Sequence, residues 1–152
     1  MKMSLKDWLR KGDLRPHKTS SKEICDILAV VDRDLRDAAV KDVSSDRRFA
    51  TAYNAILQLA TIVIRVEGYR VAGQHHHWLT LQALPHIMPS MDSSRADYYD
   101  ACRRKRNRVD YDSAEIISET EAEEALEEAH EFRHVVTDWL KKSHPKLLRE
   151  TL

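Results

Sequence analysis

Apolar residues recur along this chain with the 3.6-residue period of an α-helix, and not with the alternation of a half-buried strand. One long stretch opens with Ser20 and Glu23 at capping-box spacing, and a second follows Ser44 or Ser45 and is expected to stop at Gly68. The apolar positions of the first are Ile24, Ile27, Leu28, Val31, Leu35 and Ala38. Those of the second are Phe49, Ala52, Tyr53, Ile56, Leu59, Ala60, Val63 and Ile64. The pattern predicts two long amphipathic helices.

The C-terminal part of the chain predicts a third long helix. Its start is marked by Ser118 with Glu121, or by Thr120 with Glu123, again at capping-box spacing, and it extends to about Lys142. Its expected core positions are Ala122, Ala125, Ala129, Phe132, Val136, Trp139 and Leu140.

Shorter helices are expected between and before these segments. One covers about residues 5–11, and another follows a loop at residues 69–77 and ends near Pro89. Ser93 or Ser94 caps a further helix that runs into a basic stretch. No segment has the pattern of a strand. The sequence therefore predicts an all-α fold, an up-down bundle of four to five main helices with a short N-terminal helix.

Length and composition place this bundle in one domain. The chain has 152 residues, and we expect an extension at 1–19, the bundle at 20–143 and a tail at 144–152. Lys and Arg number 25 and Asp and Glu number 25, so no global basic field attracts nucleic acid. Cys25 and Cys102 match no metal or disulfide spacing, no signal peptide is recognisable, and Thr61 and Arg65 interrupt the longest apolar run. We expect a cytoplasmic protein with no membrane contact.

Local charge is concentrated in one run. Five of the six residues from 103 to 108 are Lys or Arg, and Asn107 and Tyr111 add hydrogen-bonding and stacking capacity. Such a patch suits a phosphodiester backbone and unpaired bases. A structural alternative is that the last helix neutralises it, because that helix carries Glu119, Glu121, Glu123, Glu124, Glu127, Glu128 and Glu131.

Two histidine patterns in the sequence are candidate sites. His130, Glu131 and His134 spell the H-E-x-x-H of zinc proteases, but the helical period places both histidines opposite the expected core face, and no third ligand is evident, so we expect no metal site. His75, His76 and His77 follow one another, and imidazoles in such a run can act as general acid or base, cap the next helix, or remain solvated. Three successive residues cannot all face one point.

Three segments in the middle of the chain carry a family resemblance. They are residues 48–60 (RFATAYNAILQLA), residues 67–76 (EGYR, then GQHH after two residues) and residues 103–112 (RRKRNRVDYD). Together they resemble the long second helix, the loop and the motif-bearing region of HEPN domains from prokaryotic toxin–antitoxin and defence systems. The resemblance implies a homodimer in which two motif-bearing helices face each other across a cleft.

The resemblance also implies an activity and a site. Active members are metal-independent endoribonucleases with no cofactor, and their signature is an Arg followed, after four to six residues, by a His. Carried over to this chain, the site residues are Arg103, Arg106, Asn107 and Tyr111. RNA is then an expected partner, and a nucleotidyltransferase antitoxin, which in some members modifies a tyrosine just past the His, is another.

This chain departs from the signature at the histidine. Counted from Arg106 the position holds Tyr111, and counted from Arg104 it holds Val109. Valine transfers no proton, and tyrosine has an ordinary pKa of about 10. Enzymatic activity is therefore left open.

A substitute imidazole is available from the loop. His75 or His76 is the candidate contributor, within one subunit or across a dimer. Two functions remain open: an RNA-binding or RNA-cleaving module with its site at the dimer cleft, or a non-catalytic dimerisation or regulatory partner of a nucleotidyltransferase or another effector.

Overall fold

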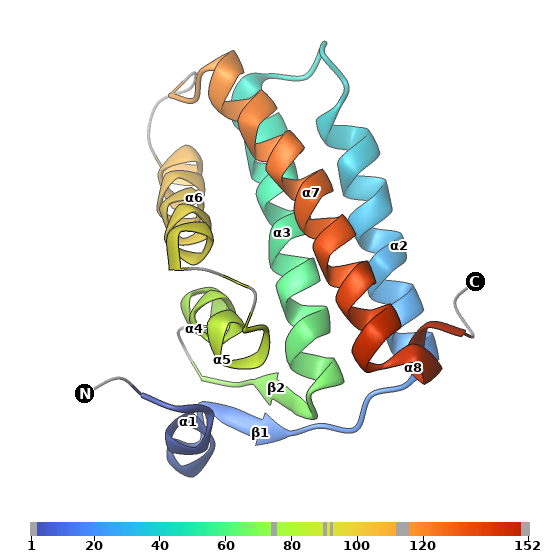
Figure 1. Cartoon of the computed structure of the whole chain (residues 1–152). Coiled ribbons are helices and arrows are strands. Elements are labelled where there is room, and N and C mark those ends of the chain that lie inside the picture. The colour runs from blue at the N-terminus through green and yellow to red at the C-terminus, as the bar shows by residue number, and fades with distance from the viewer. Residues whose placement is uncertain (1–2, 74–75, 90, 92, 112–115, 150–152) are drawn as a thin grey trace.

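The computed structural model describes residues 3–73, 76–89, 91, 93–111 and 116–149. In chain order its elements are α1 (Leu5–Lys11), β1 (Leu14–Pro16), α2 (Ser21–Ala38), α3 (Ser45–Val66), β2 (Tyr69–Val71), α4 (His76–Gln82), α5 (Leu84–Ile87), α6 (Ser93–Tyr111), α7 (Glu119–Ser143) and α8 (Pro145–Arg149). Helices dominate, and α2, α3 and α7 lie side by side (Figure 1). The predicted all-α helical fold is confirmed.

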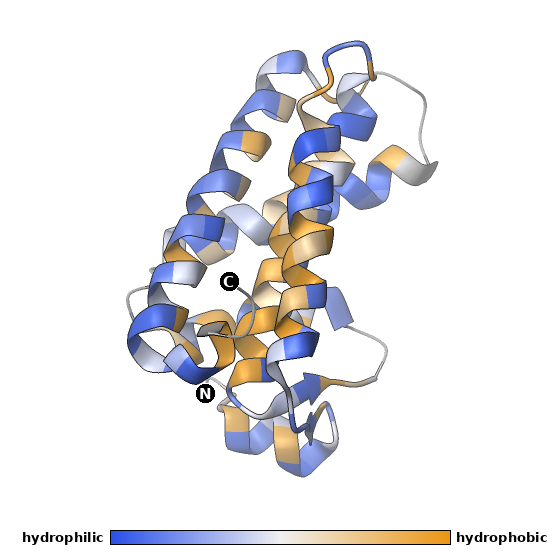
Figure 2. Ribbon diagram, turned by 90° about the vertical axis from the view of Figure 1, so that its right-hand side faces the viewer, coloured by the Kyte–Doolittle hydropathy of each residue, from blue (hydrophilic) through white to orange (hydrophobic). Residues whose placement is uncertain are grey.

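Helix α3 is the centre of the molecule. It packs against α2 and α7 on one side and against α6, α4 and α5 on the other, and Figure 2 shows apolar residues gathered inside while the surrounding helices are hydrophilic outside. By length and composition alone α3 is apolar enough to cross a membrane, but 67% of its most apolar window is buried inside the protein. Packing on several sides accounts for this apolar composition.

The predicted helix starts are largely correct. Ser44 caps α3 by accepting a hydrogen bond from the Arg47 amide, and Ser118 with Glu121 forms the complete capping box of α7. Ser20 caps α2 as expected.

The second half of the α2 capping box differs from the prediction. The Glu23 carboxylate binds His17, Thr19 and Arg65 instead of the Ser20 amide. It thereby links the segment before α2 to the C-terminal end of α3.

Two short strands were not predicted. Strand β1 pairs antiparallel with β2, with Leu14 opposite Val71, and Leu14 is only 1% exposed. Each strand has three residues, which is too short to display an alternating pattern. Gly68, with φ of 99°, turns the chain from α3 into β2 through a conformation that glycine adopts without strain.

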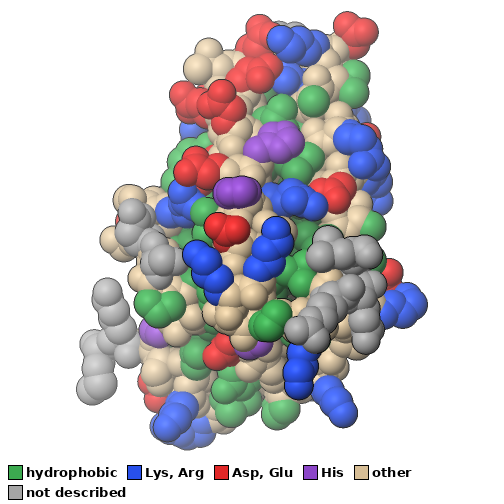
Figure 3. Space-filling model, turned by 45° about the vertical axis from the view of Figure 1, so that its right-hand side comes forward, with side chains coloured by type: hydrophobic (Ala, Val, Ile, Leu, Met, Phe, Trp, Pro, Cys, Tyr) green, Lys and Arg blue, Asp and Glu red, His purple; other side chains and the backbone are tan. Residues whose placement is uncertain are grey.

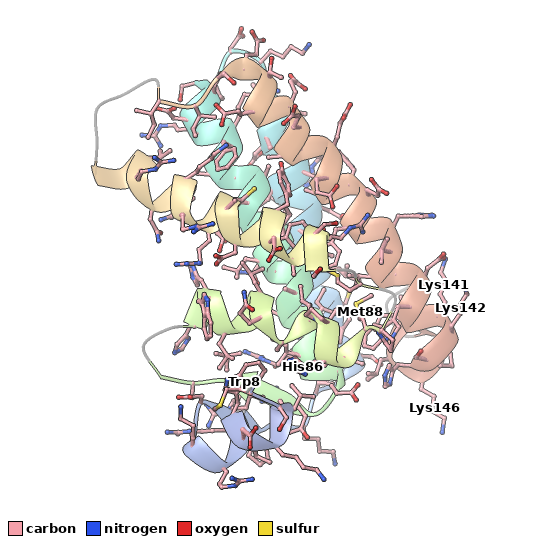
Figure 4. All side chains as sticks on the ribbon, turned by 60° about the vertical axis from the view of Figure 1, so that its left-hand side comes forward. Trp8, His86, Met88, Lys141, Lys142 and Lys146 are labelled. Atoms are coloured by element: carbon pink, nitrogen blue, oxygen red, sulfur yellow. The ribbon has the colours of Figure 1, made fainter. Side chains whose placement is uncertain are left out.

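The helical segment near Pro89 also differs in detail. It is divided into α4 and α5, with Ala83 between them and Pro85 in the first turn of α5. Trp8 of α1 contacts His86 of α5 with ring centroids 5.2 Å apart, and Figure 4 shows these two side chains between the helices. The N-terminal helix therefore packs beneath α5.

Buried polar groups fix how α3 sits against its neighbours. Arg48, 2% exposed, donates to the Ala38 carbonyl at 2.8 Å and to Glu123 at 2.7 Å, and so joins α3 to the end of α2 and to α7. Asp46 accepts a hydrogen bond from the Ile117 amide at 2.9 Å. A charge buried in this way is tolerated because it is paired and hydrogen-bonded.

Candidate functional site

The basic run lies on the C-terminal half of α6, a helix that packs on α3, α4 and α5. Ala96, Tyr99 and Cys102 form its buried side. The Tyr99 hydroxyl donates to Glu128 at 2.8 Å, and its ring lies 5.0 Å from that of Phe132, centroid to centroid. These contacts hold α6 in one rotational position and so decide which basic side chains face inward and which face outward.

The acidic helix α7 neutralises part of the basic run. Lys105 pairs with Glu121 at 2.5 Å, and other α7 carboxylates bind Arg95 and Arg48, which lie outside the run. Arg103 pairs instead with Asp100 of its own helix at 2.8 Å.

Two guanidinium groups of the run remain exposed. The Arg104 side chain is 66% exposed and lies 3.7 Å from Asp100, and Arg108 is exposed as well. The alternative that α7 neutralises α6 is therefore correct for Lys105, while Arg104 and Arg108 present positive charge to solvent.

A second group of side chains gathers where α3, α4 and α6 meet. Arg103 and Arg106 are half-buried, each one helical turn beyond a buried residue of α6. Tyr53 of α3 is 1% exposed, and the ring of His77 at the start of α4 lies 6.3 Å from the Tyr53 ring, centroid to centroid. Figure 4 shows α4 beside α6, with side chains that end in nitrogen between them.

The ionisation of this group reflects its surroundings. Partial cover of the ring, and then the charges of Arg106, His76 and Arg103, lower the pKa of His77 below its ordinary 6.5. Burial raises the pKa of Tyr53 far above its usual range, against the opposing pull of Arg103 and Arg106. At neutral pH His77 is therefore a neutral imidazole and Tyr53 an un-ionised phenol.

A groove adjoins this group on the other side of His77. It has a volume of about 270 Å³ and is lined on its polar side by Gln58, Thr61 and Arg65 of α3 and by His76, His77 and Thr80 of α4. The Thr61 and Thr80 hydroxyls already donate to backbone carbonyls. The donors that the groove offers next to the neutral imidazole are therefore the Gln58 amide and the N–H groups of Arg65 that do not bind Glu23.

The predicted site residues are only partly brought together. Arg103 and Arg106 share the inner group, whereas Asn107 is exposed and lines a separate shallow depression with Arg104 and Arg108. His76 is exposed at the start of α4 and lines the groove.

Two predicted contributors cannot be placed. His75 lies outside the described residues, as does the side chain of Tyr111, the last residue of α6. Val109, at the other histidine register, is partly buried against the core.

The sequence pattern does not single out His77 or Tyr53 as site residues. His77 belongs to a run of three histidines, and only the packing of α4 on α3 and α6 distinguishes it from its neighbours. Tyr53 was assigned to the core from its spacing, which is correct, and the spacing gave no sign that its ring would contact His77.

The H-E-x-x-H residues lie elsewhere. His130, Glu131 and His134 are all exposed on α7, so the prediction that the two histidines point away from the core is confirmed. Figure 3 shows a face on which histidines lie at the surface among interspersed acidic and basic side chains. Within the described part of the chain, no group of three or more His, Cys, Asp or Glu residues could hold a metal ion.

The helical bundle, with a basic helix packed on a long central helix, is consistent with the HEPN-like fold expected from the sequence. A model of the HEPN family HEPN_SAV_6107 matches residues 38–137, a span that runs from the end of α2 through most of α7. The chain belongs to the HEPN family. No curated protein and no solved structure matches it.

Proposed function

We propose that this protein binds single-stranded RNA through the basic half of α6 and acts as a metal-independent endoribonuclease-like module of a toxin–antitoxin or defence system. The observation that supports this most is the exposure of Arg104 and Arg108 despite the acidic helix beside them. Guanidinium groups on one helix can contact successive phosphates. Arg103 and Arg106 lie on a different face of the same helix, beside Tyr53 and His77, and offer a second place for a phosphate.

Single-stranded RNA is favoured over a duplex because the basic surface is a single helix and because the groove beyond His77, which α3 and α4 line, is small. A groove of about 270 Å³ lies just below the usual volume of small-ligand pockets, roughly 300–1,000 Å³, and so has room for one base or ribose. Sequence-tolerant RNA binding commonly combines a basic track with such local pockets for unpaired nucleotides.

The proposed assembly is a homodimer in the cytoplasm. Family membership supports two copies whose α6 helices face each other across a cleft, so that RNA contacts basic side chains from both. Sedimentation analysis of the purified protein tests this directly: a dimer is expected, and a monomer at micromolar concentration would contradict it.

Binding is tested by fluorescence anisotropy of labelled single-stranded RNA in EDTA, over a series of salt concentrations. Binding should weaken as salt rises, and Arg106→Ala should reduce affinity several-fold and lower the magnitude of the log–log salt slope by about 0.7 for one lost phosphate contact. Lys142→Ala is the matched control, because this exposed lysine lies at the far end of α7 (Figure 4). Absence of salt-sensitive binding would contradict the proposal.

A non-catalytic role is the second candidate. The partly buried valine at position 109 and the absence of a histidine from residues 103–112 support it. In this role the protein is a dimerisation or regulatory partner of a nucleotidyltransferase or another effector. RNA cleavage in EDTA by the wild-type protein would exclude it.

A further inference from the structure

His77 occupies the junction between the basic helix and the groove. Its ring contacts Tyr53 from α3, it forms part of the groove wall, and its helix packs on α6. Helices α4 and α6 are oriented so that the first turn of α4 and the basic C-terminal half of α6 lie on the same side of the molecule (Figure 4). The exposed His77 imidazole thus lies between the half-buried Arg103 and Arg106 on one side and the groove on the other.

We infer that His77 is the proton-transfer residue of this chain, acting on an RNA strand whose phosphate lies on Arg103 and Arg106 and whose neighbouring unpaired nucleotide occupies the groove. The inference rests on the proposed function. It assigns the proton transfer to a residue of α4, outside the basic helix that carries the arginines.

The proposed cleavage needs no reactant other than RNA and the protons exchanged with solvent water. The His77 imidazole accepts the proton of a ribose 2′-hydroxyl, and the 2′-oxygen forms a bond to the adjacent phosphorus. The bond from phosphorus to the 5′-oxygen of the next nucleotide breaks, and that oxygen takes a proton from water while the imidazolium returns its proton to solvent. The products are a 2′,3′-cyclic phosphate and a 5′-hydroxyl end, and the guanidinium groups stabilise the charge that develops on phosphorus oxygens.

The surroundings of His77 suit a general base. The groups that face it are Arg103 and Arg106 from α6, His76 from its own helix and Tyr53 from α3. Partial burial of the ring, and then the charges of Arg106, His76 and Arg103, lower its pKa, so the imidazole is unprotonated and able to accept a proton at pH 7. Tyr53 stays un-ionised, so it adds no negative charge that would hold a proton on His77.

The groove makes the proposed cleavage selective for unpaired nucleotides. Gln58 and Arg65 place an amide and a guanidinium on the α3 side, and Arg65 is already oriented by Glu23 at 3.1 Å. These groups can hold the sugar or base of one unpaired nucleotide while its 2′-hydroxyl faces His77. A base paired in a duplex cannot enter the recess.

The test compares His77→Ala with His134→Asn. The second variant removes an exposed imidazole from α7, away from the groove and the basic helix. Cleavage of a labelled single-stranded RNA is followed in EDTA together with RNA affinity and far-UV circular dichroism. His77→Ala should cleave at least about 100-fold more slowly, with affinity unchanged within about twofold. Added free imidazole should restore part of the rate, and His134→Asn should behave as wild type.

The pH dependence of the cleavage rate distinguishes proton transfer by His77 from a purely structural role of this residue. The wild-type rate should rise through a pKa below 6.5 and then level off, and this acidic limb should disappear in His77→Ala. A strand carrying 2′-O-methyl groups should bind without being cut.

The outcomes separate the two proposals. If RNA binds but the wild type does not cut it, or if His77→Ala cuts within threefold of wild type, the assignment of His77 is overturned and RNA binding stands. If no RNA binds, the proposed function itself fails. If imidazole does not restore cleavage and affinity falls with the rate, His77 has a structural role and the inference is wrong.

Discussion

Removal of the Tyr53 hydroxyl should stabilise this protein. The Tyr53 side chain is 1% exposed, and its hydroxyl has no hydrogen-bond partner within the described structure. A buried hydroxyl without a partner costs roughly 1–3 kcal/mol. Tyr53→Phe keeps the ring and its contact with His77 and removes only the polar atom. We therefore expect the free energy of unfolding to rise by about 1 kcal/mol, which for a chain of this length raises the thermal midpoint by about 2–4 °C.

Tyr99→Phe is the matched comparison. Tyr99 is equally buried, but its hydroxyl donates to Glu128 at 2.8 Å. Its removal takes a hydrogen bond from a carboxylate and should cost about 1–2 kcal/mol. Urea denaturation followed by circular dichroism gives both free energies. A destabilising Tyr53→Phe, or shifts of both variants in the same direction by similar amounts, would show that the buried Tyr53 hydroxyl carries no such cost.

Three further predictions concern stability. Arg48→Met should lower the free energy of unfolding by about 2–3 kcal/mol in urea denaturation, below the 3–5 kcal/mol typical of a fully buried pair because Glu123 is partly exposed; a loss under 1 kcal/mol would contradict it. Ser118→Ala should cost about 1 kcal/mol in the same assay, because the α7 cap is lost, and no change would contradict it. The Lys105 ammonium, with the Ser118 amide, lowers the pKa of Glu121 below 4.5, so its stabilisation is complete above about pH 4.5 and is lost as pH falls through the lower folded value. Thermal midpoints of Glu121→Gln should accordingly depend less on pH in that acidic range than those of wild type, and identical pH dependence would contradict this.

Most of the fold could be predicted from the sequence because long helices repeat their pattern over several turns. The starts of α3 and α7 were marked by serines whose side chains accept amide hydrogen bonds, and this signal is local. The pairing of Leu14 with Val71 was missed because the two residues are distant in sequence and their strands are short. The break between α4 and α5 was missed because apolar spacing continues across it.

The candidate site was less predictable because it depends on contacts between helices. The basic run of α6 and the glutamates of α7 are both evident in the sequence. Which cations these glutamates neutralise depends on the rotation of α6, which the contact between Tyr99 and Phe132 fixes. His77 differs from His76 in its contact with Tyr53, and a run of identical residues carries no information about that contact.

The proposal that the basic half of α6 binds RNA is tested most directly by a charge-matched pair of double variants. Arg104→Ala with Arg108→Ala removes two exposed cations from α6, whereas Lys141→Ala with Lys142→Ala removes two exposed cations from the far end of α7 (Figure 4). Affinity for single-stranded RNA is measured by anisotropy in EDTA at several salt concentrations. The α6 variant should bind at least about tenfold more weakly, with a salt slope smaller in magnitude by roughly 1.4 for two lost phosphate contacts, and the α7 variant should match wild type. Equal losses in the two variants, or no loss in either, would contradict RNA binding by α6.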